Sequence, residues 1–168
     1  MFNKLIVVIN GKGGTGKDTL CNSMEEKYKI MNISAIEPIK DIARQHGWNG
    51  EKDDKSRRFL AELKRAFVNY NDLPTAYLKN KTDEFMEGDA EILFVHIREA
   101  DQIEQYKQAI SPNKCITLLV KRDAVDNRPL YGNSADDDVN NYEYDFSFEN
   151  NLPIAESTAE FCRFLENI

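Results

Sequence analysis

Apolar residues recur along the chain in two rhythms, one typical of strands and one typical of helices. Short apolar or alternating runs predict five strands, at 5–9, 32–36, 91–97, 115–120 and 144–148. Apolar residues three or four positions apart predict helices, at about 16–31, 37–46, 56–70, 73–86, 99–110 and 153–168. Strands that alternate with helices indicate an α/β domain around a parallel sheet.

Two predicted helices carry apolar stripes from which their buried faces can be inferred. In the first, Leu20, Met24, Tyr28 and Met31 lie four, four and three residues apart, so we expect one helix from residue 16 to about 31. The clearest stripe belongs to 56–70 and comprises Phe59, Leu60, Leu63, Ala66, Phe67 and Tyr70. Such a stripe is typical of a helix face that packs against a core.

A glycine-rich stretch joins the first strand to the first helix. It comprises Gly11, Lys12, Gly13, Gly14, Thr15, Gly16, Lys17, Asp18 and Thr19. Glycines at such a junction let the backbone curl with its N–H groups pointing inward, which makes a cradle for anionic oxygens. In this strand–turn–helix context the pattern indicates a phosphate-binding loop, with Lys17 reaching the β- and γ-phosphates of a nucleotide. The alternative is a glycine-rich turn without a ligand.

Three residues bear on a metal at this loop. The Ser or Thr that holds Mg²⁺ in the strict pattern is replaced by Asp18, and Thr19 comes one place later. His96 ends the third strand, where many phosphate-loop enzymes place an Asp for Mg²⁺ or its water. Because Mg²⁺ prefers hard oxygen ligands, we interpret His96 as a hydrogen-bonded core residue.

Basic residues follow the third and fourth strands, at the sheet edge where ligands gather in parallel sheets. We expect Arg98 to contact a phosphate, and Arg122 and Arg128 to close over transferring phosphates. Arg128 lies in the polar stretch 123–141, which has no clear periodicity and is long for a connection. Such loops are often lids, although a surface loop without a role is the alternative.

Further cations lie between the second and third strands. Arg57 and Arg58 begin a helix, where the helix dipole disfavours positive charge unless an anion is bound nearby. Lys40 shares a helix face with Arg44 and could look toward the phosphate of an acceptor. The alternative is that all of these are solvated surface charges.

Composition narrows the possible partners. The 168 residues are 41% hydrophobic and 30% charged, and the net charge of -7 argues against broad nucleic-acid binding. A few arginines can still focus a positive field in a cleft. The three cysteines are far apart, which argues against a disulfide framework or structural zinc. No signal peptide or membrane-length run is visible, so we expect one cytoplasmic domain over 1–168, as a monomer or homodimer.

Four segments together resemble the nucleoside monophosphate kinases, particularly the phage-type deoxynucleoside monophosphate kinases. They are Gly16-Lys17-Asp18-Thr19, in which that group also has Asp after Lys, Pro38-Ile39-Lys40-Asp41, Arg57-Arg58-Phe59-Leu60 and Ile97-Arg98. Residues 142–146 and 150–151 are similar to the closing strand and turn of the group. The chain differs in being shorter between the second and third strands and in having His96 where the group tends to have an acid.

The resemblance implies a three-layer α/β P-loop kinase fold with a parallel five-stranded sheet in the order 2-3-1-4-5. It implies an acceptor-side helical insertion at about 37–88 and a lid-like loop at about 123–141. ATP and Mg²⁺ would be cosubstrates, with the phosphates on 11–19 and the metal on Asp18 and Thr19. The acceptor, a nucleoside or deoxynucleoside monophosphate, would be held by Lys40, Arg57, Arg58 and Arg98.

Three alternatives stay open at this point. The first is a kinase of another small molecule, because the fold hosts many. The second is a partitioning-type ATPase, which the chain resembles at Lys12 to Lys17 and in which the first lysine acts across a dimer. The third is a nucleotide-binding module without turnover, which His96 suggests.

Overall fold

A parallel sheet of five strands forms the middle layer of the computed structural model, which describes residues 4–127 and 138–168. The strands are β1 (Leu5–Asn10), β2 (Ile30–Ser34), β3 (Ile92–His96), β4 (Ile116–Lys121) and β5 (Phe146–Glu149). They lie in the order β2-β3-β1-β4-β5, and every neighbouring pair is parallel. The predicted sheet and its order are confirmed.

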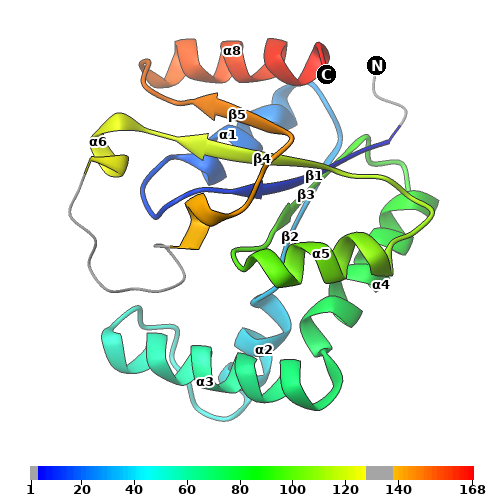
Figure 1. The fold of residues 1–168 in the computed structure, drawn as a ribbon, viewed down its shortest axis with the longest axis vertical. Helices are drawn as coiled ribbons and strands as arrows, with labels where there is room; N and C mark the ends of the chain where they lie inside the picture. Colours follow the sequence, from blue (N-terminus) through cyan, green and yellow to red (C-terminus); the bar gives the residue numbers. More distant parts are fainter. Residues whose placement is uncertain (1–3, 128–137) are drawn as a thin grey trace.

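Helices cover both faces of the sheet, which gives three layers (Figure 1). On one face α1 (Lys17–Ser23) and α8 (Ile154–Glu166) pack over a cluster that includes Val7 and Ile9. On the other face α4 (Leu73–Glu87) and α5 (Ala100–Ala109) pack over a cluster that includes Ile6 and Val8. Because successive strand residues point to opposite faces, the apolar run of β1 supplies both cores.

The predicted helix from residue 16 to 31 is wrong in its second half. Helix α1 ends at Ser23, a 3-10 turn η1 (Met24–Glu26) follows, and β2 already begins at Ile30. The backbone N–H groups of Lys27 and Tyr28 both donate to the Met24 carbonyl, at 3.1 and 2.9 Å, and close the turn. Leu20, Met24 and Tyr28 are buried as expected, because a turn can continue the buried stripe of a helix.

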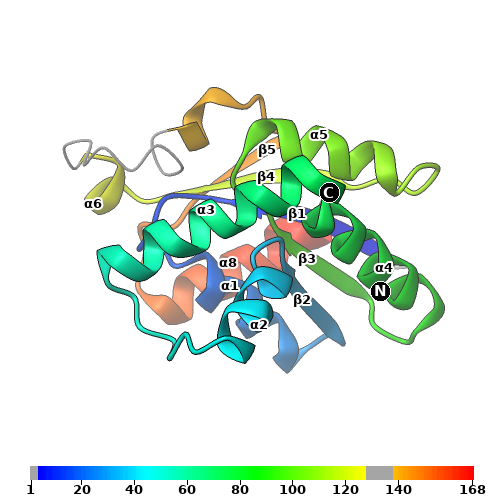
Figure 2. The ribbon, with the colours of Figure 1, turned by 90° about the horizontal axis from the view of Figure 1, so that it is seen from below.

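The apolar stripe of α3 (Asp54–Asn71) is only partly covered. This helix packs mainly on α2 (Glu37–Gln45) and α4 and lies beyond them as seen from the sheet (Figure 2). Phe59 is 43% exposed and Tyr70 is 85% exposed, whereas Leu60, Leu63 and Phe67 are half-buried. The stripe predicts the helix correctly but not a buried face, because among the described residues no further layer covers its outer side.

Two short helices complete the described chain, α6 (Asp123–Asp126) and η2 (Asp138–Asn141). Most of the predicted lid at 123–141, including Arg128, lies outside the described residues. The fifth strand spans 146–149 rather than 144–148, because residues 142–145 make side-chain contacts with α5, β1 and β4 instead of pairing as a strand. Within the described ranges no helix combines the length and apolar character that crossing a membrane requires.

Candidate active site

The glycine-rich loop turns sharply between β1 and α1. Gly16 caps α1 in the left-handed conformation, with φ 83 and ψ 12, which a residue with a Cβ rarely adopts. A Cβ at Gly16 would also lie 2.6 Å from Nδ2 of Asn150. A Cβ at Gly11 would lie 2.6 Å from the carbonyl oxygen of Val120. Both glycines are therefore required by close contacts with the ends of β4 and β5 as well as by the turn.

Hydrogen bonds hold the loop from inside and from behind. Thr15 is fully buried and donates from its backbone N–H and its Oγ1 to the Lys12 carbonyl, at 3.3 and 3.0 Å. The Asn150 amide donates to the Thr15 carbonyl at 2.7 Å, while the Asn150 backbone N–H donates to the Lys121 carbonyl at 2.8 Å. Gly13 and Gly14 remain exposed at the rim. The loop is thus prepared to present N–H groups to an anion.

The two lysines of the loop are placed differently. Lys17 is the first residue of α1 and is half-buried. Lys12 points back to its own chain, with Nζ 3.6 Å from Oδ1 of Asp126 on α6 and a side chain 14% exposed. Of these two lysines, Lys17 is therefore the one that lies at the start of α1, close to the exposed Gly13 and Gly14.

Asp18 and His96 face each other beside the loop. Nδ1 of His96 lies 3.7 Å from Oδ1 of Asp18, and Nε2 lies 3.3 Å from Oδ1 of Asn32. Burial lowers the pKa of His96, the Asp18 carboxylate opposes that shift, and Lys17 adds to it. His96 is hydrogen-bonded, as predicted, but it lies half-buried at the sheet edge and contacts the loop rather than sitting within the core.

The donor set at this edge fits a magnesium ion shared with a nucleotide. The Asp18 side chain is 79% exposed, and Thr19 is exposed beside it. Over residues 4–127 and 138–168, no three His, Cys, Asp or Glu side chains form a metal-binding group. Mg²⁺ is commonly held by one or two carboxylates together with substrate phosphates. Asp18 and Thr19 offer oxygens for such a shared site.

The predicted acceptor cations occupy several elements around the loop. The start of α3 lies at the same end of the molecule as α6 and the β1–α1 loop (Figures 1 and 2). Arg57 and Arg58 lie there and are exposed, and Arg57 lies 3.7 Å from Asp54. Lys40 is half-buried on α2. Exposed Arg98 follows β3, and exposed Arg122, which was predicted to contact the donor phosphates, follows β4.

Sequence reasoning missed two polar groups at the carboxyl ends of the strands. The carboxylate of Glu37, at the start of α2, accepts a hydrogen bond from the Tyr77 hydroxyl. Burial, and then this bond, raises the pKa of Tyr77. Glu99, after β3, is bound by Lys64 of α3 at 2.7 and 2.8 Å. Each carboxylate comes three residues after the last residue of a strand, and this position near a strand end is the signal that could have found it.

A hollow of about 660 Å³ opens on the sheet face opposite α8, next to α6. Its walls include Lys121, Asp123, Asp126, Tyr142, Tyr144 and Glu149. Phe146, Ser147 and Glu149 of β5 line it, whereas Phe148 lies on the other face of the strand and makes a ring contact with Phe164 of α8. Because Asp126 also pairs with Lys12, this hollow adjoins the loop.

The fold is similar to that of solved kinases. No protein-family model matches the chain, and no curated protein is significantly similar to it in sequence. The tunicamycin resistance protein of Deinococcus radiodurans is 12% identical and has a TM-score of 0.61 over 97% of this chain and 96% of that chain. An unliganded sugar kinase from Janibacter sp. HTCC2649 is 15% identical, with a TM-score of 0.55 over 97% of this chain and 95% of that chain.

A thymidylate kinase from Candida albicans is 12% identical, with a TM-score of 0.55 over 98% of this chain and 92% of that chain. At such identities the likeness shows the fold alone. The chain has the three-layer α/β P-loop kinase fold that its sequence predicts. The likeness does not single out the phage-type group among kinases of this fold.

Proposed function

We propose that this protein is an ATP-dependent phosphotransferase that transfers the γ-phosphate of ATP to a nucleoside or deoxynucleoside monophosphate. The proposal depends chiefly on one observation, the loop 11–16, which is held by Thr15 and Asn150 and followed directly by Lys17 at the start of α1. A strand–loop–helix unit of this form is suited to bind the phosphates of a nucleotide. The likeness to solved kinases supports the same class of reaction.

The chain's own residues would act by binding and neutralising charge, which is most of what phosphoryl transfer requires. The backbone N–H groups of the loop would bind the donor phosphates, and Lys17 would bridge the β- and γ-phosphates. Asp18 and Thr19 would hold Mg²⁺, which supplies charge neutralisation when bound. Arg122, and Arg128 outside the described residues, would close over the donor and exclude water.

On the acceptor side, Lys40, Arg57, Arg58 and Arg98 would offset the repulsion between two phosphate-bearing substrates. A phosphate acceptor is already an anion, so this reaction needs no strong general base. The guanidinium of Arg57 lies 3.7 Å from the Asp54 carboxylate, and both side chains are exposed. Such a weak surface ion pair can be exchanged for another anionic partner.

A second candidate acceptor, an alcohol, is favoured by Glu37. Glu37 comes shortly after the end of β2. Between them, the Ala35 N–H donates to the carbonyl of His96, the last residue of β3, at 3.1 Å and keeps this stretch at the carboxyl edge of the sheet. Glu37 therefore lies at the edge where the acceptor would bind. A carboxylate there could take the proton of an attacking hydroxyl, and it would repel a phosphate.

The position of Lys12 supports a kinase over a partitioning-type ATPase. Its ammonium is paired with Asp126 of the same chain and is largely buried. To act across a dimer, it would have to give up that pair. ATP-dependent dimerisation that Lys12→Ala abolishes would favour the ATPase instead.

The deciding assay incubates the protein with ATP, Mg²⁺ and each common nucleoside and deoxynucleoside monophosphate, and separately with a panel of sugars and other alcohols. We expect a nucleoside diphosphate from at least one monophosphate. Lys17→Ala should lower the rate about 10²-fold or more, while Lys12→Ala retains most of it. ATP binding without product from any monophosphate would overturn the nucleotide-kinase proposal.

Glu37→Gln separates the two acceptors. With a monophosphate acceptor, the substitution should leave the rate nearly unchanged or raise it. With an alcohol acceptor, loss of the base should lower the rate by about 10²-fold or more. Tyr77→Phe, which removes only the hydroxyl that binds Glu37, is the matched control for disturbance of α2.

A further inference from the structure

Asn10 uses its whole side-chain amide to join three parts of the chain. It is the last residue of β1, directly before the loop, and is 1% exposed. Its Oδ1 accepts from the Gly11 N–H at 2.9 Å. Its Nδ2 donates to the Arg98 carbonyl at 3.0 Å and to the Tyr144 hydroxyl oxygen at 2.8 Å. With these partners the buried amide is a fully satisfied polar group. An apolar side chain would be enough for packing at this end of the strand, so the amide is present for its hydrogen bonds.

The Tyr144 hydroxyl passes this connection to the segment that follows the predicted lid. It accepts from Asn10 and donates to the Val139 carbonyl at 2.9 Å, within η2. Burial raises the pKa of Tyr144 to about 12, so the hydroxyl keeps the proton that it donates. The path from the loop to η2 therefore consists of two side chains, Asn10 and Tyr144.

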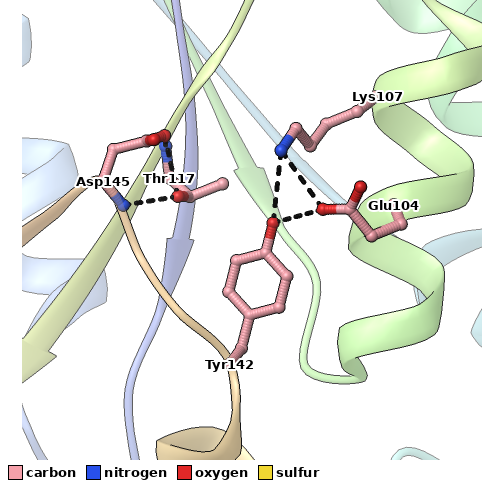
Figure 3. Close-up of polar contacts among 5 residues, drawn as sticks. All are labelled: Glu104, Lys107, Thr117, Tyr142 and Asp145. Atoms are coloured by element: carbon pink, nitrogen blue, oxygen red, sulfur yellow. Dashed lines mark hydrogen bonds and ion pairs between the residues drawn. The ribbon is translucent and has the colours of Figure 1, made fainter.

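Neighbouring residues of the same segment are attached elsewhere (Figure 3). The Tyr142 hydroxyl donates to Glu104 at 2.5 Å and lies 3.4 Å from Nζ of Lys107, both on α5. Asp145 accepts from the backbone N–H and Oγ1 of Thr117 on β4, at 2.8 and 2.9 Å. Tyr142 and Asp145 thus hold the segment to α5 and β4, whereas Tyr144 reaches the residue before the loop.

We infer that Asn10 is a positioning residue that couples nucleotide binding at the loop to the Arg98 main chain and to residues 138–145. The amide is planar, so the direction of the Gly11 N–H fixes where Nδ2 points, and with it the partners on Arg98 and Tyr144. A nucleotide that orders the loop also orders this segment. The inference rests on the nucleotide binding of the proposed function, but not on the identity of the acceptor.

The test is hydrogen–deuterium exchange over 138–145, with and without the non-hydrolysable nucleotide Mg·AMP-PNP. In the wild-type protein the nucleotide should slow exchange of this segment about fivefold or more, the usual range of coupling between sites. Tyr144→Phe should remove most of this effect while nucleotide affinity changes little. Tyr142→Phe, the matched control in the same segment, should retain the effect.

Asn10→Asp is a second variant, because it keeps the Oδ1 acceptor for Gly11 and loses the Nδ2 donor. It should also lose the nucleotide effect. If Tyr144→Phe responds like the wild type, or Tyr142→Phe loses as much as Tyr144→Phe, the inference is overturned. Nucleotide binding without phosphotransfer would overturn the proposed function and leave this test intact, whereas no binding would overturn both.

Discussion

The backbone conformation and the surroundings of Gly16 leave no room for a side chain in the loop. Its left-handed backbone and the Asn150 amide, 2.6 Å from where a Cβ would lie, act against any side chain. Gly47 has a similar φ of 99, but a Cβ there would meet nothing within 4 Å. A side chain would therefore strain the backbone at either glycine, but of the two it would clash with a neighbouring residue only at Gly16.

Gly16→Ala should abolish nucleotide binding, because relief of the clash displaces Asn150 from the Thr15 carbonyl. Gly47→Ala should cost about 1–2 kcal/mol of unfolding free energy through backbone strain alone and retain binding. Binding of a fluorescent ATP analogue and urea unfolding of both variants measure the difference. Equal binding by Gly16→Ala and Gly47→Ala would contradict the role given to Asn150.

His96 lies beside Asp18, which we propose to hold Mg²⁺, and should therefore affect which metal binds there. Its Nδ1 is 3.7 Å from Oδ1 of Asp18, so a nitrogen adjoins the proposed oxygen ligands, and an oxygen at this position would suit Mg²⁺ better. His96→Asp should lower the Mg²⁺ concentration for half-maximal nucleotide binding and reduce any preference for Mn²⁺. Titrations with both metals, followed by calorimetry and by the electron paramagnetic resonance of Mn²⁺, measure it. His96→Asn is the matched neutral control, and an unchanged Mg²⁺ requirement would contradict a place for His96 at the metal.

At the scale of elements, single polar side chains fix the ends of helices. Lys4 donates to the carbonyls of Phe85, Gly88 and Ala90, at 2.7, 2.7 and 2.8 Å, and so caps the carboxyl end of α4. Glu166 near the end of α8 accepts from Lys27 and from the Tyr28 hydroxyl, just beyond η1. Each contact joins segments that are distant in the sequence.

Lys4→Met should lower the unfolding free energy by about 1–2 kcal/mol, because it keeps the side-chain stem and loses three bonds from a charged donor. The loss should appear in urea unfolding monitored by circular dichroism. Lys79→Met, at an exposed lysine of the same helix that pairs with Asp83 four residues on, should change the unfolding free energy little. A similar loss in both variants would argue that charge, not capping, is responsible.

The contact of Glu166 gives a stability that depends on pH. Hydrogen bonds from Lys27 and Tyr28 lower the pKa of Glu166 from 4.5 to about 2. The stabilisation is therefore complete above pH 4.5 and is lost as pH falls toward 2. Glu166→Gln should lower the Tm at pH 7, and the difference from the wild type should shrink between pH 4.5 and 2. A constant difference across that range would contradict the assignment.

At the scale of the whole molecule, nucleotide binding should stabilise the complete fold. The loop contacts the ends of β4 and β5 as well as β1 and α1, so a ligand there binds only the folded chain. Mg·AMP-PNP at about 100 times its Kd should add about 2.7 kcal/mol and raise the Tm by roughly 5–10 °C. Lys17→Ala should lose most of this shift in a thermal melt. An equal shift in both proteins would place the nucleotide elsewhere.

The sequence predicts the strands and the loop because these depend on local runs of residues and on a recognisable motif, whereas the order of the strands follows only from the resemblance to a kinase family. It mispredicts the end of α1, since one buried stripe can pass from a helix into a turn. It does not predict the contacts of Asn10 with Tyr144 or of Thr15 with Asn150. Periodicity tells which face of an element is buried, whereas these contacts depend on which distant residue arrives there.

The Asn150 bond also has a consequence for how the protein is made. The Thr15 carbonyl and the Asn150 amide lie 135 positions apart in the chain. During translation the motif therefore leaves the ribosome well before its supporting amide does. A nascent chain carries an incompletely supported loop until the segment around Asn150 has emerged and folded beside it.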